Sequence, residues 1–100
     1  MISIANDNKR KVVYSAKFKK DYRKSLKQGK SKELVDWVIH ELANDRPLPE
    51  KFCDHALTGN WLGYRECHVN PDWLLIYKKN KKGELTLTLF RLASHSELDF

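Results

Sequence analysis

The sequence lacks any long hydrophobic run. No apolar stretch approaches the ~20 residues that a membrane-spanning helix needs, and residues 1–10 lack the apolar core of a secretory signal. These absences argue against a membrane-spanning protein and against a secreted one. We therefore expect a cytoplasmic protein with no membrane partner.

Cysteine is also scarce. The chain has two cysteines, Cys53 and Cys67, and neither belongs to a Cys-x-x-Cys motif. In a cytoplasmic protein such cysteines stay reduced. We expect both to be packing residues, because cysteine is frequently buried, and a redox or nucleophilic role is the less favoured alternative.

No compact metal-binding motif is present. The chain contains neither His-Glu-x-x-His nor a pair of spaced histidines combined with Cys-x-x-Cys. His55, His68, Asp72 and His95 are residue types that bind metals, so a metal site is an alternative to weigh. Their spacing leads us to expect neither a metal nor a small-molecule cofactor.

The length and composition are those of a single globular domain. One hundred residues leave room for one domain spanning 1–100. Hydrophobic residues at 41% and charged residues at 32% are ordinary for such a fold. A chain this short buries only part of its surface, so its stability margin is thin.

The net charge of +6 is concentrated in the first third of the chain. Residues 1–32 hold eleven Lys or Arg against two Asp or Glu, a balance of +9, while residues 33–100 hold eight against eleven, a balance of −3. Such a basic surface, with Lys17, Lys20 and Lys24 at its centre, attracts polyanions and speeds their encounter. It also suits an acidic protein partner, and a solvated lysine-rich helix face is the structural alternative.

Two amphipathic helices are expected in the first half. The first is capped by Ser15 and reaches about residue 28, and the second is capped by Ser31 and reaches about residue 44. Their apolar stripes recur at helical spacing: Phe18, Tyr22 and Leu26, then Leu34, Val35, Val38, Ile39 and Leu42. Because the link at Gly29 is short, the helices should pack antiparallel.

Strands are expected around this hairpin. They cover residues 12–14, 62–69, 73–78 and 84–91. Tight turns at Asn70-Pro71 and at residues 80–83 make the last three strands an antiparallel meander. The fold class is therefore α+β, with the helices packed on one face of the sheet.

Strand alternation assigns faces to the chemically active residues. Glu66 and His68 share one face, and Cys67 and Val69 share the other. The second pair suits the helix-covered side, so Glu66 and His68 should face away from the helices.

The position of Arg91 is less clear. It shares strand parity with Leu85, Leu87 and Leu89, which suit the core. Arg91 can reach the open face only if the strand ends, twists or bulges near Phe90.

The segment from Asp54 to His95 concentrates groups that move protons. It holds three of the four histidines, with several acids and Arg91. RNA is cleaved without a metal when its own 2′-hydroxyl attacks the neighbouring phosphorus, which requires a base, an acid and a charge stabiliser. Histidine suits the proton transfers because its unperturbed pKa is about 6.5, and arginine suits the phosphate. In a small basic protein this combination predicts an RNA-cleaving enzyme.

Each residue also has a structural interpretation. A single histidine is more often a surface or capping residue, and Glu66 can be a cross-strand ion-pair partner. Asp72 can hydrogen-bond the backbone of its turn, and Arg91 can pair with Glu97 or the C-terminal carboxylate.

Two aromatic residues are candidates for substrate binding. Trp73 or Tyr64 can stack on an unpaired base, worth about 1–3 kcal/mol per base. Trp73 suits the core of the sheet equally, so both interpretations stand.

Four motifs follow one another with a family's spacing. They are Asp54-His55, Leu57-Thr58-Gly59-Asn60-Trp61, Tyr64-Arg65-Glu66-Cys67-His68 and Pro71-Asp72-Trp73-Leu74-Leu75-Ile76-Tyr77. The tail from Arg91 through His95 to Leu98 completes the pattern. Over residues 14–100 the chain resembles the RelE/ParE superfamily of bacterial toxins, in its YafQ-like branch of ribosome-dependent mRNA interferases.

The resemblance implies a fold, an activity and partners. The fold would be a twisted antiparallel sheet with the helical hairpin on one face. The activity would be metal-independent cleavage of mRNA in the ribosomal A site, beside ribosomal RNA. A cognate antitoxin would bind the protein and block it.

The resemblance also implies residue roles. The family's proton-transfer and positioning residues match His55, His68, Asp72 and His95. Glu66 falls where an acidic residue assists, Arg91 where the phosphate is held, and Trp73 beside the site. We expect His95 to be the general acid, and His68 or Asp72 the general base.

One departure concerns the C-terminus. The family often ends in His-x-x-Leu-Phe, whereas here Asp99 stands between Leu98 and Phe100. If Phe100 seats the substrate, the insertion shifts it. Two alternatives stay open: a toxin-like binding module without efficient cleavage, and a ParE-like toxin that poisons gyrase, although ParE-type members generally lack the histidine set.

Overall fold

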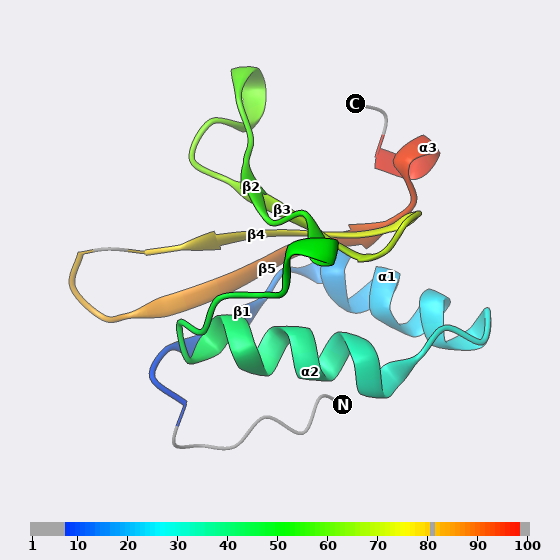
Figure 1. The fold of residues 1–100 in the computed structure, drawn as a ribbon, viewed down its shortest axis with the longest axis horizontal. Helices are drawn as coiled ribbons and strands as arrows, with labels where there is room; N and C mark the ends of the chain where they lie inside the picture. Colours follow the sequence, from blue (N-terminus) through cyan, green and yellow to red (C-terminus); the bar gives the residue numbers. More distant parts are fainter. Residues whose placement is uncertain (1–7, 81, 99–100) are drawn as a thin grey trace.

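A mixed β-sheet with two 12-residue helices on one face dominates the computed structural model, which describes residues 8–80 and 82–98 (Figure 1). Its strands are β1 (Lys11–Tyr14), β2 (His55–Ala56), β3 (Arg65–Asn70), β4 (Trp73–Lys79) and β5 (Thr86–Ala93). In the described residues they lie in the order β1-β5-β4-β3-β2. The helices are α1 (Ala16–Lys27), α2 (Lys32–Ala43) and the short α3 (His95–Leu98), with 3-10 turns η1 (Glu50–Phe52) and η2 (Gly59–Trp61) in the connector.

Serine caps both long helices, as predicted. The Ser15 hydroxyl accepts a hydrogen bond from the Phe18 amide at 2.9 Å, and the Ser31 hydroxyl accepts one from the Leu34 amide at 3.2 Å. Gly29 sits between the helices with φ +82°, which a glycine adopts without strain. The hairpin is therefore defined locally, by two caps and one glycine.

Apolar residues fill both faces of the sheet. The larger cluster lies between the sheet and the long helices and includes Phe18, Val38 and Leu75. A smaller cluster on the opposite face joins Leu74 and Ile76 to half-buried aromatic residues of the connector. Burying each such side chain stabilises the fold by about 1.5–3 kcal/mol, so the sheet is fixed from both sides.

The first strand corrects one expectation. β1 runs parallel to β5, with Lys11 opposite Thr86 and Tyr14 opposite Leu89, whereas the other neighbours pair antiparallel. The antiparallel sheet implied by the family resemblance is therefore wrong at this edge. The chain leaves β1 through the helical hairpin and returns to its side much later, and such a crossover is what a parallel pair requires.

A bulge in β5 settles the position of Arg91. Ile76 pairs with Arg91 and the next residue, Tyr77, pairs with Leu89, so Phe90 is the extra residue. Leu89 packs in the helix-side cluster, while Phe90 packs in the opposite one. The bulge near Phe90 is the condition under which Arg91 leaves the core, and the strand satisfies it.

Other boundaries differ from the predicted ones. β3 begins at Arg65 and β5 at Thr86, because residues 62–64 and 84–85 belong to turns and links. The predictions contained neither β2 nor α3, whose 2 and 4 residues are too few to show a period. Within residues 8–80 and 82–98, no helix is both long and apolar enough to cross a membrane.

Candidate active site

Glu66 joins two histidines at the outer edge of the sheet. His55 on β2 pairs with Glu66 on β3, and His68 follows two residues later on the same face. Glu66 Oε1 lies 3.4 Å from His55 Nε2 and 3.5 Å from His68 Nε2. Residues predicted to share the open face are therefore brought into one group.

The hydrogen bonds of His55 fix where its protons lie. Its Nδ1 lies 2.6 Å from the Cys53 carbonyl oxygen, which can only accept, so Nδ1 carries a proton. Its other nitrogen faces Glu66, a buried carboxyl whose Oε2 has no hydrogen-bond partner among the described residues. A buried carboxylate without partners is costly, so the two imidazoles that contact Oε1 are the groups that compensate its burial.

His95 and Asp72 form a second imidazole–carboxylate pair. Asp72 lies in the β3–β4 turn, where its amide donates to Asn70 Oδ1 at 3.1 Å. Its Oδ1 accepts hydrogen bonds from the His95 backbone amide at 3.1 Å and from His95 Nδ1 at 2.9 Å. These two donors lower the pKa of Asp72 and leave Nε2 of His95 pointing away from the pair.

The three imidazoles lie in one row. The ring of His68 lies between the other two, 6.3 Å from the ring of His55 and 5.7 Å from that of His95, centre to centre. His55 and His95 are about half exposed, at 49% and 55% of the side chain, and His68 is 23% exposed. These residues, which are distant in the sequence, thus lie together in the structure, and their part in catalysis stays a prediction.

Arg91 occupies the far side of this sheet face. It follows His55, Glu66 and Ile76 in one cross-strand row. Its Nε and Nη2 donate to Asp21 of α1, at 2.7 and 3.4 Å. Among the described residues Arg91 therefore pairs with α1 and not with Glu97, and the C-terminal carboxylate lies outside the described residues.

The basic face of α1 adjoins α3. Lys24 makes an ion pair of 2.5 Å with Glu97, two residues after His95. Lys20 and Lys17 lie one and two turns earlier than Lys24 and are exposed. Of the three predicted basic residues, Lys24 is therefore the one that the structure places next to the element carrying His95.

The aromatic residues predicted to bind substrate differ in their environments. Trp73 is 1% exposed and donates its indole N–H to Ser25 at 3.0 Å, so it is a core residue and offers no face to a base. Tyr64 is half-buried and packs against Trp61 and Phe90 at 5.5 and 5.3 Å. Phe100, the third candidate, lies outside the described residues.

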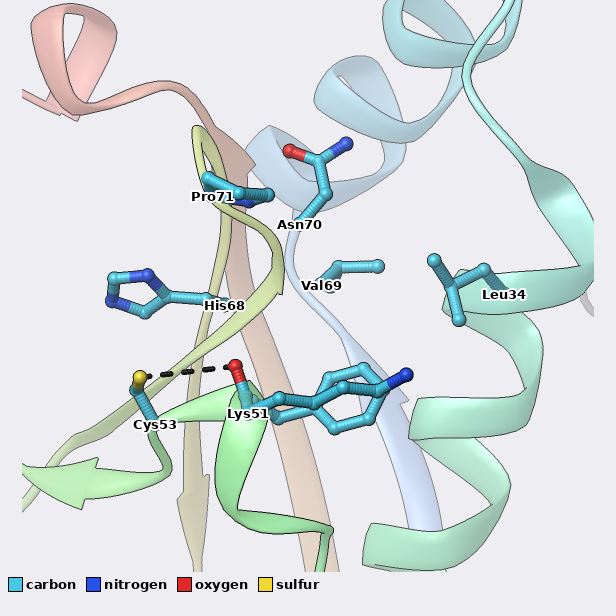
Figure 2. Close-up of a pocket in the computed structure, with 8 residues that line it drawn as sticks. Leu34, Lys51, Cys53, His68, Val69, Asn70 and Pro71 are labelled. Atoms are coloured by element: carbon cyan, nitrogen blue, oxygen red, sulfur yellow. Dashed lines mark hydrogen bonds between the residues drawn. The ribbon is translucent and has the colours of Figure 1, made fainter.

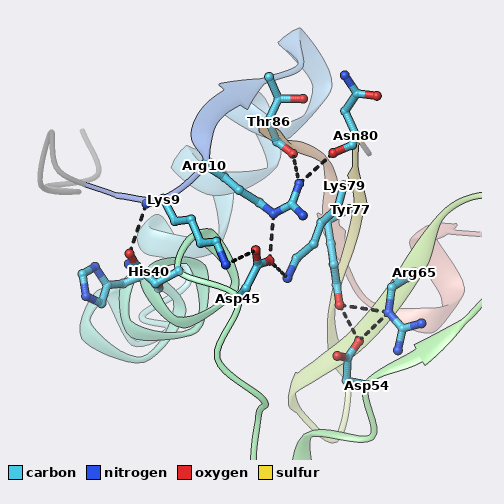
Figure 3. Close-up of polar contacts among 11 residues, drawn as sticks. Lys9, Arg10, His40, Asp45, Asp54, Arg65, Tyr77, Lys79, Asn80 and Thr86 are labelled. Carbon is cyan, nitrogen blue, oxygen red and sulfur yellow. Dashed lines mark hydrogen bonds and ion pairs between the residues drawn. The ribbon is translucent and has the colours of Figure 1, made fainter. Parts of the chain in front are cut away.

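Sequence reasoning missed a hydrogen-bonded group next to His55, formed by Asp54, Arg65 and Tyr77, which we call the Asp54 clamp. Asp54 Oδ1 accepts hydrogen bonds from the Tyr77 hydroxyl at 2.5 Å and from Arg65 Nε at 3.3 Å (Figure 3). Burial, and then the bond to Asp54, raise the pKa of Tyr77. All three belong to the motifs quoted above, and that signal could have identified them as partners that fix the connector just before His55.

The cysteines differ in exposure. Cys67 is fully buried, as expected, and burial raises the pKa of its thiol. Cys53 is exposed, and its φ of +49° is unusual for a residue with a side chain. In residues 8–80 and 82–98 no group of at least three His, Cys, Asp or Glu is arranged to hold a metal ion.

The family assignment follows from comparison with known sequences. A family model described as a bacterial toxin of type II toxin–antitoxin systems, YafQ, matches residues 10–99. This chain belongs to the YafQ family. The mRNA interferase toxin YafQ of Escherichia coli K12 is 38% identical over 90 residues, which are 89% of this chain and 95% of that protein.

Solved structures of bacterial toxins share the fold. The toxin of the E. coli DinJ–YafQ toxin–antitoxin complex is 37% identical, with a TM-score of 0.80 over 90% of this chain and 97% of that one. A metal-bound toxin from Helicobacter pylori is 45% identical, with a TM-score of 0.83 over 89% and 98%. The α+β architecture is thus that of YafQ-family toxins.

Proposed function

We propose that this YafQ-family toxin is an mRNA interferase: an endoribonuclease that cleaves translated mRNA by acid–base catalysis. The observation that carries the proposal is the row of three imidazoles, in which two carboxyl groups contact the rings. A base, an acid and a charge partner are the groups that attack by a 2′-hydroxyl requires. The curated E. coli relative is itself named an mRNA interferase.

His95 is the proposed general acid. Asp72 holds its Nδ1–H, so Nε2 is the nitrogen that donates a proton to the departing 5′-oxygen. The carboxylate also stabilises the imidazolium before the transfer. Asp72 itself is a poor base because its hydrogen bonds from His95 lower its pKa, so of the two candidates for the base we favour His68.

His68 then removes the proton of the 2′-hydroxyl. Its Nε2 faces Glu66, which leaves Nδ1 to accept that proton. Glu66 offsets the positive charge that develops on the ring, and His55 contacts the same carboxyl oxygen. Both nitrogens of His55 are thus engaged, and its role is to position and compensate Glu66.

The phosphate and the RNA backbone require cations. Nη1 of Arg91 has no hydrogen-bond partner among the described residues and is the group that would contact the phosphate, while Asp21 holds the rest of the guanidinium. Lys17, Lys20 and Lys24 would follow the neighbouring phosphates. Removing either set should weaken substrate contact more than it weakens folding.

The partners follow from the same proposal. We expect the substrate to be mRNA in the ribosomal A site, which makes the cytoplasm the site of action, and the basic surface of α1 to contact ribosomal RNA. The E. coli relative is seen in a toxin–antitoxin complex with DinJ, and we expect a cognate antitoxin here too.

Mapping of mRNA 5′ ends after induced expression tests the function. The proposal expects cuts inside translated messages, in register with codons, from the wild-type protein and none from His95→Ala. Uncut messages in growth-arrested cells would instead indicate a binding module or a toxin with another target. Repeating the reaction on the same RNA with and without ribosomes tests ribosome dependence.

A further inference from the structure

We propose that a cavity beside His68 binds an unpaired nucleobase of the RNA substrate. This inference rests on the function proposed above and concerns how the substrate is selected. The cavity has a volume of about 440 Å³, within the range typical of small-molecule sites. It opens between the end of β3, η1 and the start of α2 (Figure 2).

The cavity exists because the connector departs from β3. β2 covers β3 only opposite Glu66 and Arg65. The chain leaves η1, turns sharply at Cys53, whose φ is +49°, and then enters β2. The rest of β3 therefore has no strand on its outer edge among the described residues, and Leu34 of α2 forms the opposite wall.

The walls and rim suit a flat ring with polar edges. Leu34, Phe52, Val69 and Pro71 make the lining predominantly apolar, as the face of a base requires. Asn70 stands at the rim, where its Oδ1 already accepts the Asp72 amide. Its Nδ2 makes no hydrogen bond to the described residues and can donate to an acceptor on the base edge.

The backbone of His68 adds a second polar pair. The Tyr64 carbonyl accepts from the Leu57 amide, so its backbone groups point to the outer edge of the sheet. Because this direction alternates along a strand, the N–H and C=O of His68, four residues on, point to the same edge. A base edge presents donors and acceptors of the matching kind.

Charge favours an anionic ligand. None of the described residues that line the cavity carries a carboxylate, and Lys51 lies at its rim with Nζ 5.5 Å from the centre of the Phe52 ring. His68 lines the edge of the cavity and also belongs to the histidine row, but its imidazole points away from Leu34 and Val69 (Figure 2). A bound nucleotide would reach around the edge of β3, with its base in the cavity and its phosphate toward the histidine row on the other face.

A peptide strand is the competing occupant, and the edge is too short for it. Outward backbone groups are available at His68, but the irregularity between His68 and Asn70 then interrupts the alternation, and Pro71 begins the turn. Strand addition gains its affinity from a row of main-chain hydrogen bonds, and this edge provides too few. The pocket shape and the absence of acids favour the base.

A nuclear magnetic resonance titration tests the site without requiring catalysis. Nucleoside monophosphates should shift the Leu34 and Val69 methyl signals and the Asn70 amide signal saturably, whereas ribose 5-phosphate should shift only signals near the histidine row. Leu34→Phe, which fills the cavity, should weaken nucleotide binding about tenfold, or about 1.4 kcal/mol. Leu85→Phe is the matched control, because Leu85 is exposed and lies outside the cavity.

A second variant guards against misfolding. Asn70→Asp keeps the oxygen that caps Asp72 but replaces the amide donor with a negative charge, so it should fold normally, bind nucleotides less tightly and change the base distribution beside mapped cuts. Equal shifts from ribose 5-phosphate, or unchanged binding by both variants, would overturn the site. Shifts at these residues from a peptide and not from nucleotides would overturn it too. Intact nucleotide binding by a wild-type protein that cuts no message would support the base site and refute the nuclease.

Discussion

At the scale of single residues, each imidazole is oriented by an oxygen atom that contacts one of its ring nitrogens. His95 is oriented by Asp72, His55 by the Cys53 carbonyl, and His68 by Glu66. A histidine held at one nitrogen presents the other in a defined direction, which proton transfer needs. The acid–base assignments therefore rest on identified partners rather than on residue type.

Removing the proposed acid tests this directly. His95→Ala should lower the cutting rate by about 10²–10⁴-fold, the usual contribution of a positioned acid. Its thermal unfolding should stay close to wild type because His95 is 55% exposed. Cutting at the wild-type rate, or a protein that no longer folds, would show that His95 is not the acid.

The Asp54 clamp is expected to affect catalysis indirectly, by positioning His55. Tyr77→Phe removes one of the hydrogen bonds to Asp54 and should destabilise the protein by about 1 kcal/mol. Because Asp54 precedes His55, the catalytic rate should fall while substrate affinity holds. Urea unfolding and single-turnover cutting measure the two effects.

Tyr64→Phe is the matched control, since none of the hydrogen bonds described involves the Tyr64 hydroxyl. If Tyr77→Phe loses stability but cuts with an unchanged rate constant, the clamp supports the fold and not the site.

Much of the site was accessible from local sequence. Strand alternation placed Glu66 and His68 on one face, and the turn placed Asp72 beside them. Trp73 could not be resolved in this way, because its burial depends on Ser25 of a distant helix. The Arg91–Asp21 pair likewise spans 70 residues, and no local pattern encodes it.

At the scale of elements, the start of α1 is tied to the bulge in β5. Ser15 Oγ accepts from the Phe18 amide and donates to the Phe90 carbonyl at 2.7 Å. One side chain thus caps a helix and satisfies the backbone of the irregular strand that carries Arg91. The Ser31 hydroxyl caps α2 and makes no second hydrogen bond to the described residues.

Because Ser15 makes one hydrogen bond more than Ser31, alanine variants of the two caps can be compared. Ser31→Ala should cost about 1 kcal/mol of unfolding free energy, as for an ordinary N-cap. Ser15→Ala should cost about 1 kcal/mol more, because it also leaves the Phe90 carbonyl without its donor. Urea unfolding of both variants is the measurement, and equal losses would mean that the bulge does not depend on Ser15.

Element prediction succeeded where signals were local and failed where they were not. Both helices carry their own caps and apolar stripes, so their extents were predicted within two residues. β2 has 2 residues and is a strand only because β3 lies beside it. The parallel pairing of β1 depends on a partner some 75 residues away.

At the scale of the whole molecule, Asp45 joins three parts of the chain. It accepts hydrogen bonds from Arg10 Nε and Lys79 Nζ, both at 2.7 Å, at the end of α2 (Figure 3). Partial burial opposes its ionisation, but these cations prevail and lower the pKa of Asp45 to about 2. Ionised Asp45 therefore stabilises the folded chain.

The lowered pKa of Asp45 determines how the stability of the fold depends on pH. A carboxyl whose pKa is lower in the folded state contributes stability above its ordinary pKa near 4, and loses it as the pH falls toward 2. Asp45→Asn should cost about 1–2 kcal/mol at pH 7, with the difference from wild type shrinking between pH 4 and 2. Asparagine tolerates the φ of +55° at this position.

Unfolding in urea across this range measures the difference. Glu84→Gln is the control, since the Glu84–Lys11 pair is exposed and 4.0 Å apart. A penalty for Asp45→Asn that stays constant with pH would mean that its charge does not stabilise the fold.

The most direct test of the central claim is the chemistry of the cut ends. Purified protein, ribosomes and a defined mRNA should yield a 2′,3′-cyclic or 3′ phosphate on one fragment and a 5′-hydroxyl on the other, with cutting unaffected by a chelator. A 2′-deoxynucleotide on the 5′ side of the cut should block the reaction. Ends carrying a 5′-phosphate, or activity lost to chelator and restored by Zn²⁺, would contradict acid–base cleavage by the histidine row.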